Sequence, residues 1–220
     1  MHFSRRIFSA LAILTVGVHA NFGPYFSTGP VTSESFVLES TSTLILPRTP
    51  TDSNEDVSIW VGMSTSHGDL IRASAVNTLS RDHWKVSACT VLSANETQQT
   101  HVFGRSKNAS PRDEMTVHYK YNESTGNYTQ TVLLNGRRVS GLTTRNGKAK
   151  SWASAVECNG SNCGTLRSHA WYNTTIVLDT AEPGYIDTIN GSPGVSVDMT
   201  TGDGGKTWKI GMIVIPEYTF

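Results

Sequence analysis

The sequence predicts an all-β protein, built as a two-sheet antiparallel β-sandwich of the jelly-roll type. Three observations favour this fold: short runs in which apolar and polar residues alternate, a strong tight-turn signal, and no segment with a helical repeat of useful length. About ten such runs at this spacing are typical of two packed sheets. The 220-residue chain is 37% hydrophobic, enough for one buried core, so we expect a single domain over residues 35–220.

Residues 1–20 have the features of a secretory signal peptide. Met1–Arg6 carries two positive charges, Ile7–Val18 is apolar, and Val18-His19-Ala20 offers a small-residue cleavage site. A membrane-spanning helix needs roughly 20 apolar residues, so a membrane anchor fits this run less well. We therefore expect a secreted protein with no membrane association after signal removal. Residues 21–34 contain glycine, proline and serine without periodicity and predict an extended N-terminal arm.

The alternation is clearest in two runs, Trp84–Thr90 and Met115–Tyr121, each of which has one more polar face. Further strands are expected in the runs Phe36–Leu46, Val57–Met63, Leu70–Val76, Tyr128–Leu134, Ser151–Cys158, Thr175–Leu178, Val195–Met199 and Trp208–Ile215. Asn135-Gly136 directly follows one run and predicts a tight hairpin, because both central residues of that turn need positive φ. Asn146-Gly147 is a second such site. The sequence shows no internal repeat, which disfavours a solenoid or a propeller.

The charge balance argues against nucleic acid as a partner. Lysine plus arginine (18) equals aspartate plus glutamate (18), so there is no basic excess to neutralise phosphates. Removal of the signal peptide takes away Arg5 and Arg6, which leaves 16 basic against 18 acidic residues and a net charge of minus two.

Sequons and cysteines agree with an oxidising, extracellular compartment. Seven Asn-x-Ser/Thr sequons predict a glycoprotein that exposes Asn95, Asn108, Asn122, Asn127, Asn159, Asn173 and Asn190. Cys158 and Cys163 close a short loop and are expected to form a disulfide, while Cys89 is expected to be a buried thiol. A zinc site fits less well, because the three thiols have no neighbouring histidine pattern, so we predict no metal and no cofactor.

Thr201–Trp208 is similar to the Asp-box of sialidases. We interpret it as a structural turn in which Asp203 ties down a glycine-rich hairpin and Trp208 fills the sheet. The motif occurs once, in a chain too short for a six-bladed propeller, which argues against a sialidase.

Four segments, taken in order, resemble the fungal glutamic peptidases, or eqolisins. They are Trp60-Val61-Gly62, Gly68-Asp69-Leu70-Ile71-Arg72, the strand after Asp113, and Ser151–Glu157. The resemblance implies a secreted, concanavalin A-like β-sandwich whose concave sheet carries a catalytic glutamate and a glutamine. On this sequence the glutamate falls at Glu157, and Arg72 stands where the family has its glutamine.

This exchange argues against peptidase activity. The peptidase reaction is thought to need a carboxylate that activates water and an amide that holds the oxyanion. An arginine close to Glu157 favours the charged carboxylate and makes it a weaker base. Arg72 can instead bind an anion bidentately, with Glu157, His118 or Tyr119 supplying hydrogen bonds or proton transfer. Such a site suits uronic-acid polymers or an acidic small molecule.

Aromatic residues provide another way to bind a ligand. Trp60 and Trp152 can stack on sugars where they are exposed, whereas Trp84 and Trp208 are expected in the core. Three functions therefore stay open: an acid-base enzyme acting in its concave sheet, a non-catalytic carbohydrate-binding protein, and a cyclase- or isomerase-type enzyme of fungal secondary metabolism. The corresponding partners are a polypeptide, a polysaccharide or a small molecule.

Overall fold

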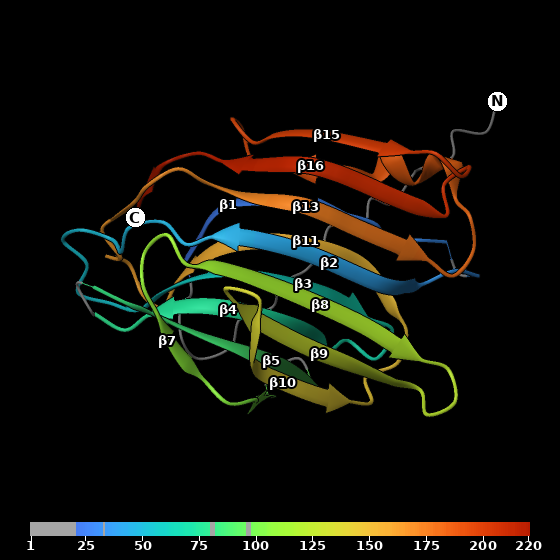
Figure 1. Ribbon diagram of the computed structural model, residues 1–220, viewed down its shortest axis with the longest axis horizontal. Helices are drawn as coiled ribbons and strands as arrows, with labels where there is room; N and C mark the ends of the chain where they lie inside the picture. The colour runs from blue at the N-terminus through green and yellow to red at the C-terminus, as the bar shows by residue number, and fades with distance from the viewer. Residues whose placement is uncertain (1–20, 33, 80–81, 96–97) are drawn as a thin grey trace.

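The computed structural model describes residues 21–32, 34–79, 82–95 and 98–220, in which two antiparallel sheets are stacked one over the other (Figure 1). Sheet A has eight strands. Seven of them follow the order β14 (Asn190–Gly191), β1 (Asn21–Thr28), β11 (Ala149–Cys158), β3 (Val57–Thr65), β4 (Leu70–Asn77), β5 (Trp84–Asn95) and β6 (Gln98–Phe103). The eighth, β7 (Lys107–Ala109), also pairs with β5. The predicted β-sandwich is confirmed.

Sheet B is seven-stranded, in the order β10 (Arg137–Thr144), β9 (Asn127–Leu134), β8 (Glu114–Asn122), β2 (Val37–Ile45), β13 (His169–Leu178), β16 (Thr207–Ile215) and β15 (Ser196–Thr201). A two-stranded sheet pairs β12 (Thr165–Leu166) with β17 (Tyr218–Thr219), and a 3-10 helix, η1, covers Pro183–Thr188. None of the helices in the described part of the chain has the length and apolar character to cross a bilayer. The expected signal peptide, residues 1–20, lies outside the described residues.

The expected N-terminal arm is in part a strand of the sandwich. Residues 21–28 form β1, an inner strand of sheet A that pairs with β11 on one side and β14 on the other. The register shifts between Phe22 and Tyr25, which interrupts the period-two pattern that alternation analysis depends on. The sequence reading also missed β6, whose residues are mostly polar.

Tryptophans and tyrosines fill the space between the sheets. Trp84, Trp152, Trp171 and Trp208 are buried there with exposed fractions of 2% or less. Tyr119 of sheet B donates its hydroxyl to the carbonyl of Val61 in sheet A, at 2.7 Å. Because the hydroxyl finds a partner on the opposite sheet, this buried phenol fixes one sheet against the other.

The two Asn-Gly sites behave differently. Asn135 (φ 50°) and Gly136 (φ 74°) form the predicted tight turn between β9 and β10. Asn146-Gly147 does not make a hairpin, because it lies between β10 of sheet B and β11 of sheet A, and only Gly147 has a positive φ (76°). Asn146 is buried there and donates to Asp69, so the connection between sheets is fixed by an amide-carboxylate hydrogen bond.

The Asp-box turn has the structural role predicted for it. Asp203 accepts backbone hydrogen bonds from Lys206 and Thr207 in the β15–β16 hairpin, and Trp208 is buried below the turn. These backbone hydrogen bonds, of which the one from Thr207 has the larger effect, lower the pKa of the Asp203 carboxyl to about 2.

The cysteines are arranged as predicted. Cys158 and Cys163 form a disulfide at the end of β11, and Cys89 is a free, buried thiol. Of the sequon asparagines, Asn108, Asn122, Asn159, Asn173 and Asn190 are exposed and Asn127 is half-buried, while the side chain of Asn95 lies outside the described residues. Glycan attachment at these positions stays a prediction.

Candidate functional site

The structure brings Arg72 and Glu157 together on the outer face of sheet A, the face directed away from sheet B. Arg72 lies on β4 and Glu157 on β11, with β3 between them, yet Nη1 of Arg72 donates to Oε2 of Glu157 at 2.8 Å. The two side chains are 14% and 21% exposed. Two residues 85 positions apart in the sequence thus form a largely buried ion pair that still reaches solvent.

Gly62 of β3 makes room for the arginine. It lies between Ala153 of β11 and Arg72 of β4 in the sheet register. A Cβ at position 62 would come within 2.5 Å of the carbonyl oxygen of Ile71 and 2.9 Å of the Cβ of Arg72. Since real Cβ atoms do not approach backbone so closely, the missing side chain at Gly62 is a condition for the position of Arg72.

Trp60 packs under the guanidinium of Arg72. The Cζ of Arg72 lies 6.0 Å from the centre of the indole ring, within the range of a cation–π contact. Trp60 is 3% exposed and forms a small apolar cluster with Ala153 and Ala155 that is separate from the core. Nε of Arg72 and Nε1 of Trp60 are buried and have no hydrogen-bond partner among the described residues. The polar groups of the pair that reach solvent belong to the outer part of the guanidinium and to the Glu157 carboxylate, since the two side chains are 14% and 21% exposed.

The side of the pair toward β5 and β6 carries Cys89, His101 and Phe103. Cys89 is the cross-strand partner of both Arg72 and Phe103, and His101 lies two residues before Phe103 on the same face. Burial raises the pKa of the Cys89 thiol, so it stays protonated near neutral pH. Burial and the charge of Arg72 lower the pKa of His101, while Glu157 partly opposes them. The ion pair is therefore felt electrostatically across the face as far as β6.

Two of the predicted ligand-binding residues are not at this surface. Trp152 is 0% exposed between the sheets, and Tyr119 is 1% exposed with its hydroxyl already bonded to Val61. The alternation of β11 puts Glu157 outward, but Trp152, five residues earlier, points inward. The structure therefore places neither Trp152 nor Tyr119 on the face that carries Arg72 and Glu157.

His118 is on the outer face of the other sheet. Its Nε2 lies 2.6 Å from Oε1 of Glu39, whose Oε2 is 3.1 Å from Nζ of Lys120. This cluster on β2 and β8, which we call the Glu39 cluster, cannot act together with Arg72, because the whole sandwich separates them. The structure therefore does not bring His118 together with Arg72 and Glu157. Trp60 is the one predicted binding residue that lies beside the pair.

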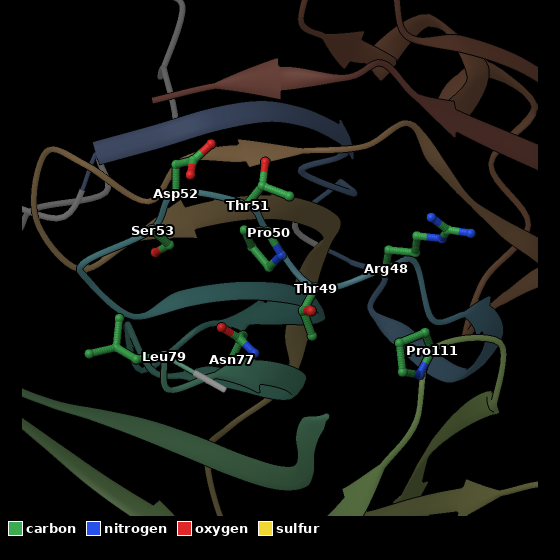
Figure 2. A pocket seen from close by; sticks show the side chains of 9 residues that line it. All are labelled: Arg48, Thr49, Pro50, Thr51, Asp52, Ser53, Asn77, Leu79 and Pro111. Carbon is green, nitrogen blue, oxygen red and sulfur yellow. The ribbon is translucent and has the colours of Figure 1, made fainter. Parts of the chain in front are cut away.

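Two further features are separate from the ion pair. A hollow of about 640 Å³, shown in Figure 2, is lined by the loop after β2, from Arg48 to Ser53, together with Asn77, Leu79 and Pro111. Glu55, Cys158 and Cys163 have the spacing of metal ligands, but the sulfurs are joined in the disulfide, and Glu55 accepts backbone hydrogen bonds from Ser161 and Asn162. Neither the hollow nor the group of Glu55, Cys158 and Cys163 includes Arg72 or Glu157.

The fold has close counterparts among solved structures, although no protein-family model and no curated protein matches the sequence. Scytalido-glutamic peptidase, solved with a transition-state analogue inhibitor, is 10% identical, with 89% of this chain and 99% of that chain covered and a TM-score of 0.53. SCP-B of the eqolisin family, solved with the tripeptide Ala-Ile-His, gives the same identity and coverage and a TM-score of 0.51. The fold is that of the glutamic peptidases. A κ-carrageenase from Pseudoalteromonas carrageenovora gives 8% identity over 84% of this chain and 66% of that one, with a TM-score of 0.38.

At 10% identity the likeness to glutamic peptidases describes the fold and leaves the chemistry to the residues present. A paired guanidinium and carboxylate offer fixed donors and acceptors without net charge, whereas a water-activating carboxylate needs a free oxygen aimed at the reacting atom. Sequence reasoning found Arg72, Glu157 and Trp60. It missed His101 and Phe103, because β6 has no clear alternation, and the aromatic-x-aromatic spacing of these two residues was the available signal.

Proposed function

We propose that this protein binds a hydroxyl-rich ligand, a carbohydrate, on the outer face of sheet A, and that it does not cleave peptides by the glutamic-peptidase reaction. The observation that carries the proposal is the 2.8 Å ion pair between Arg72 and Glu157. Both charges are compensated within the protein, so the pair favours a neutral ligand that can both accept from a guanidinium and donate to a carboxylate.

Adjacent hydroxyl groups of a sugar have this dual character. Each hydroxyl is both a donor and an acceptor, so neighbouring ones can accept from Arg72 and donate to Glu157 without breaking the ion pair. An anionic ligand would instead have to compete with Glu157 for the guanidinium. This modifies the expectation, drawn from Arg72 considered by itself, that the site selects uronic acids or acidic small molecules.

The floor of the face around the pair combines one large residue with small ones. Trp60 lies below the guanidinium, and small residues surround it: Gly62, Ala153, Ala155, Ser74 and Ser87, all of which are buried. Taller side chains stand beside this floor, Arg72 and Glu157 among them. Small residues below and polar groups at the side are the arrangement by which proteins orient a ligand with few directed hydrogen bonds.

The same ion pair argues against the peptidase reaction. In that reaction the carboxylate activates water and the amide holds the oxyanion, but here Oε2 of Glu157 is occupied by Arg72. The tryptophans offer no open stacking surface either, because all five are 3% exposed or less. The proposed binding mode therefore relies on hydrogen bonds of the pair and not on tryptophan stacking.

Affinity electrophoresis in gels containing soluble polysaccharides tests the proposal. Cellulose derivatives, xylan, laminarin, glycol chitin and polygalacturonate would be compared for retardation of the wild-type protein. We expect retardation by at least one neutral polymer, and a loss of about tenfold or more in affinity for Arg72→Ala and Glu157→Gln, since each removes a charge-assisted hydrogen bond. Lys120→Ala on sheet B is the matched control and should bind like the wild type.

Two results contradict the proposal. One is equal binding by the wild type and both pair variants, and the other is the absence of retardation by every neutral polymer. A casein-cleavage assay in acidic buffer runs in parallel: hydrolysis by the wild type that disappears in Glu157→Gln would establish a peptidase instead. Thermal unfolding of each variant shows that a lost signal does not come from a lost fold.

A further inference from the structure

Phe103 is an exposed aromatic ring on the ligand-binding face. It is 60% exposed, the highest value among the large hydrophobic side chains of the described residues. Its ring centre lies 5.8 Å from that of His101, at an interplanar angle of 51°. The two rings are both exposed and lie side by side on the edge strand of sheet A, where the open face of Phe103 offers a surface on which a ligand ring can stack.

The two rings lie on the same side of sheet A as the ion pair. Cross-strand pairing runs in one row from Gly62 through Arg72 and Cys89 to Phe103. The guanidinium lies over Trp60 of β3, and β6 is three strands away. Arg72 itself lies on β4, two strands from β6, and two spacings of about 4.8 Å give roughly 10 Å between the backbones of Arg72 and Phe103, which exceeds the width of a single sugar ring.

We propose that His101 and Phe103 form a second subsite of this face, in which one ring of an oligosaccharide stacks on Phe103 while another ring hydrogen-bonds to Arg72 and Glu157. The proposal rests on the proposed carbohydrate-binding function and adds its substrate class: a chain of linked sugars that crosses the strands, and not a monosaccharide. The residue between the two places is Cys89, which is buried and is the cross-strand neighbour of both Arg72 and Phe103.

The position within the sheet favours a sugar chain over an extended polypeptide. Peptides usually bind to a sheet by adding a strand to a free edge, with main-chain hydrogen bonds. Arg72 and Glu157 lie on β4 and β11, which are paired on both sides, so main-chain groups are free only at the other end of the proposed site, on the edge strand β6. At the ion pair, a ligand must therefore be recognised by side chains. A sugar ring suits both places, because its flat face can stack on Phe103 and the hydroxyls at its rim can hydrogen-bond to Arg72 and Glu157.

A chain-length series measures the subsite. Cello-, chito-, xylo- and laminari-oligosaccharides, from the monosaccharide to the hexasaccharide, would be titrated calorimetrically into the wild type, Phe103→Ala and Phe103→Tyr. We expect affinity to rise with chain length until the two places are bridged. Phe103→Ala should lose about tenfold for the longer chains and little for the shortest, as expected for one aromatic contact. Phe103→Tyr keeps the ring and should retain the affinity.

Met212→Ala is the matched control, because it removes an exposed hydrophobic side chain (46%) from sheet B. Affinity that depends on Arg72 and Glu157 but is unchanged in Phe103→Ala would overturn the subsite and leave the proposed function standing. Binding that is independent of the pair would remove both. Capture of gelatin, an unfolded polypeptide, that is lost in Phe103→Ala would assign the subsite to peptides and overturn the sugar assignment.

Discussion

The two faces of the sandwich carry charged clusters that are built in different ways. On sheet A, Arg72 and Glu157 are 14% and 21% exposed, and the guanidinium lies over Trp60. On sheet B, the members of the Glu39 cluster are between 31% and 62% exposed. Water can take the place of a removed partner in the Glu39 cluster, but it reaches the Arg72–Glu157 pair poorly. The loss of one partner should therefore cost more folding stability on sheet A than on sheet B.

The difference shows why one cluster is a candidate site and the other is not. Sheet A combines a shielded ion pair with two buried donors, Nε of Arg72 and Nε1 of Trp60, that have no partner within the described part of the chain. In the Glu39 cluster each carboxylate oxygen already has a partner, one in His118 and one in Lys120. A ligand can exploit an ion pair that is shielded from water but still reaches the surface. An exposed cluster whose oxygens are already paired is typical of a solvated surface.

Removal of one member of each cluster should show the largest contrast. Arg72→Ala leaves Glu157 largely buried without its partner, and we expect a loss of about 3 kcal/mol in the free energy of unfolding. Lys120→Ala should cost less than about 1 kcal/mol, because its ion pair is exposed. Urea denaturation of both variants measures the values. Equal losses would show that burial does not separate the two clusters.

Acid sensitivity on sheet B should come from the buried His169. Burial lowers the pKa of His169 to about 4, against a hydrogen bond to the carbonyl of Arg167 that raises it. The unfolded chain takes up a proton at His169 near pH 6.5, and the folded chain does so only near pH 4. The stability that depends on neutral His169 is therefore fully present above about pH 6.5 and declines as the pH falls to 4.

The loss attributable to His169 amounts to about 2 to 3 kcal/mol over this pH range. His169→Phe removes the titrating group, so its stability should change less than that of the wild type between pH 7 and pH 4. Thermal unfolding as a function of pH measures the difference. An unchanged pH profile would show that His169 is not responsible, and His169→Gln checks that the result does not depend on the size of the phenyl ring.

The sequence allowed the fold and half of the site to be predicted, and particular residues show why the rest was missed. Alternation revealed inner strands such as β8, where period two is uninterrupted, but it failed for β1, where the register shifts between Phe22 and Tyr25. Arg72 and Glu157 were found by their likeness to a family motif. Trp152 was assigned to the ligand surface from its residue type, although alternation along β11 puts it on the face opposite Glu157. Glu39 was missed because its partners lie 79 and 81 positions away.

Gly62 on sheet A and Gly141 on sheet B differ in how much space each leaves for a side chain. A Cβ on Gly62 of sheet A would meet the carbonyl oxygen of Ile71, whereas a Cβ on Gly141 of sheet B would meet first the far end of the flexible Arg138 side chain. We expect Gly62→Ala to cost about 2 kcal/mol and to weaken carbohydrate binding, because overpacking displaces Arg72. Gly141→Ala should be tolerated within about 0.5 kcal/mol. Denaturation and gel retardation of both variants test this, and a tolerated Gly62→Ala would contradict the packing argument.

The smallest expected effect is the acid titration of the Glu39 cluster. Burial alone would raise the pKa of Glu39, but hydrogen bonds from His118 and Lys120 outweigh it and hold the pKa below its usual value of 4.5. The stability contributed by the charged Glu39 carboxylate is therefore present above pH 4.5 and is lost as the pH falls through the lowered pKa. Glu39→Gln should cost less than about 1 kcal/mol at pH 7, and less still in high salt. Below the lowered pKa the variant and the wild type should converge. A difference that persists at pH 2 would mean that Glu39 stabilises sheet B by packing and not by its charge.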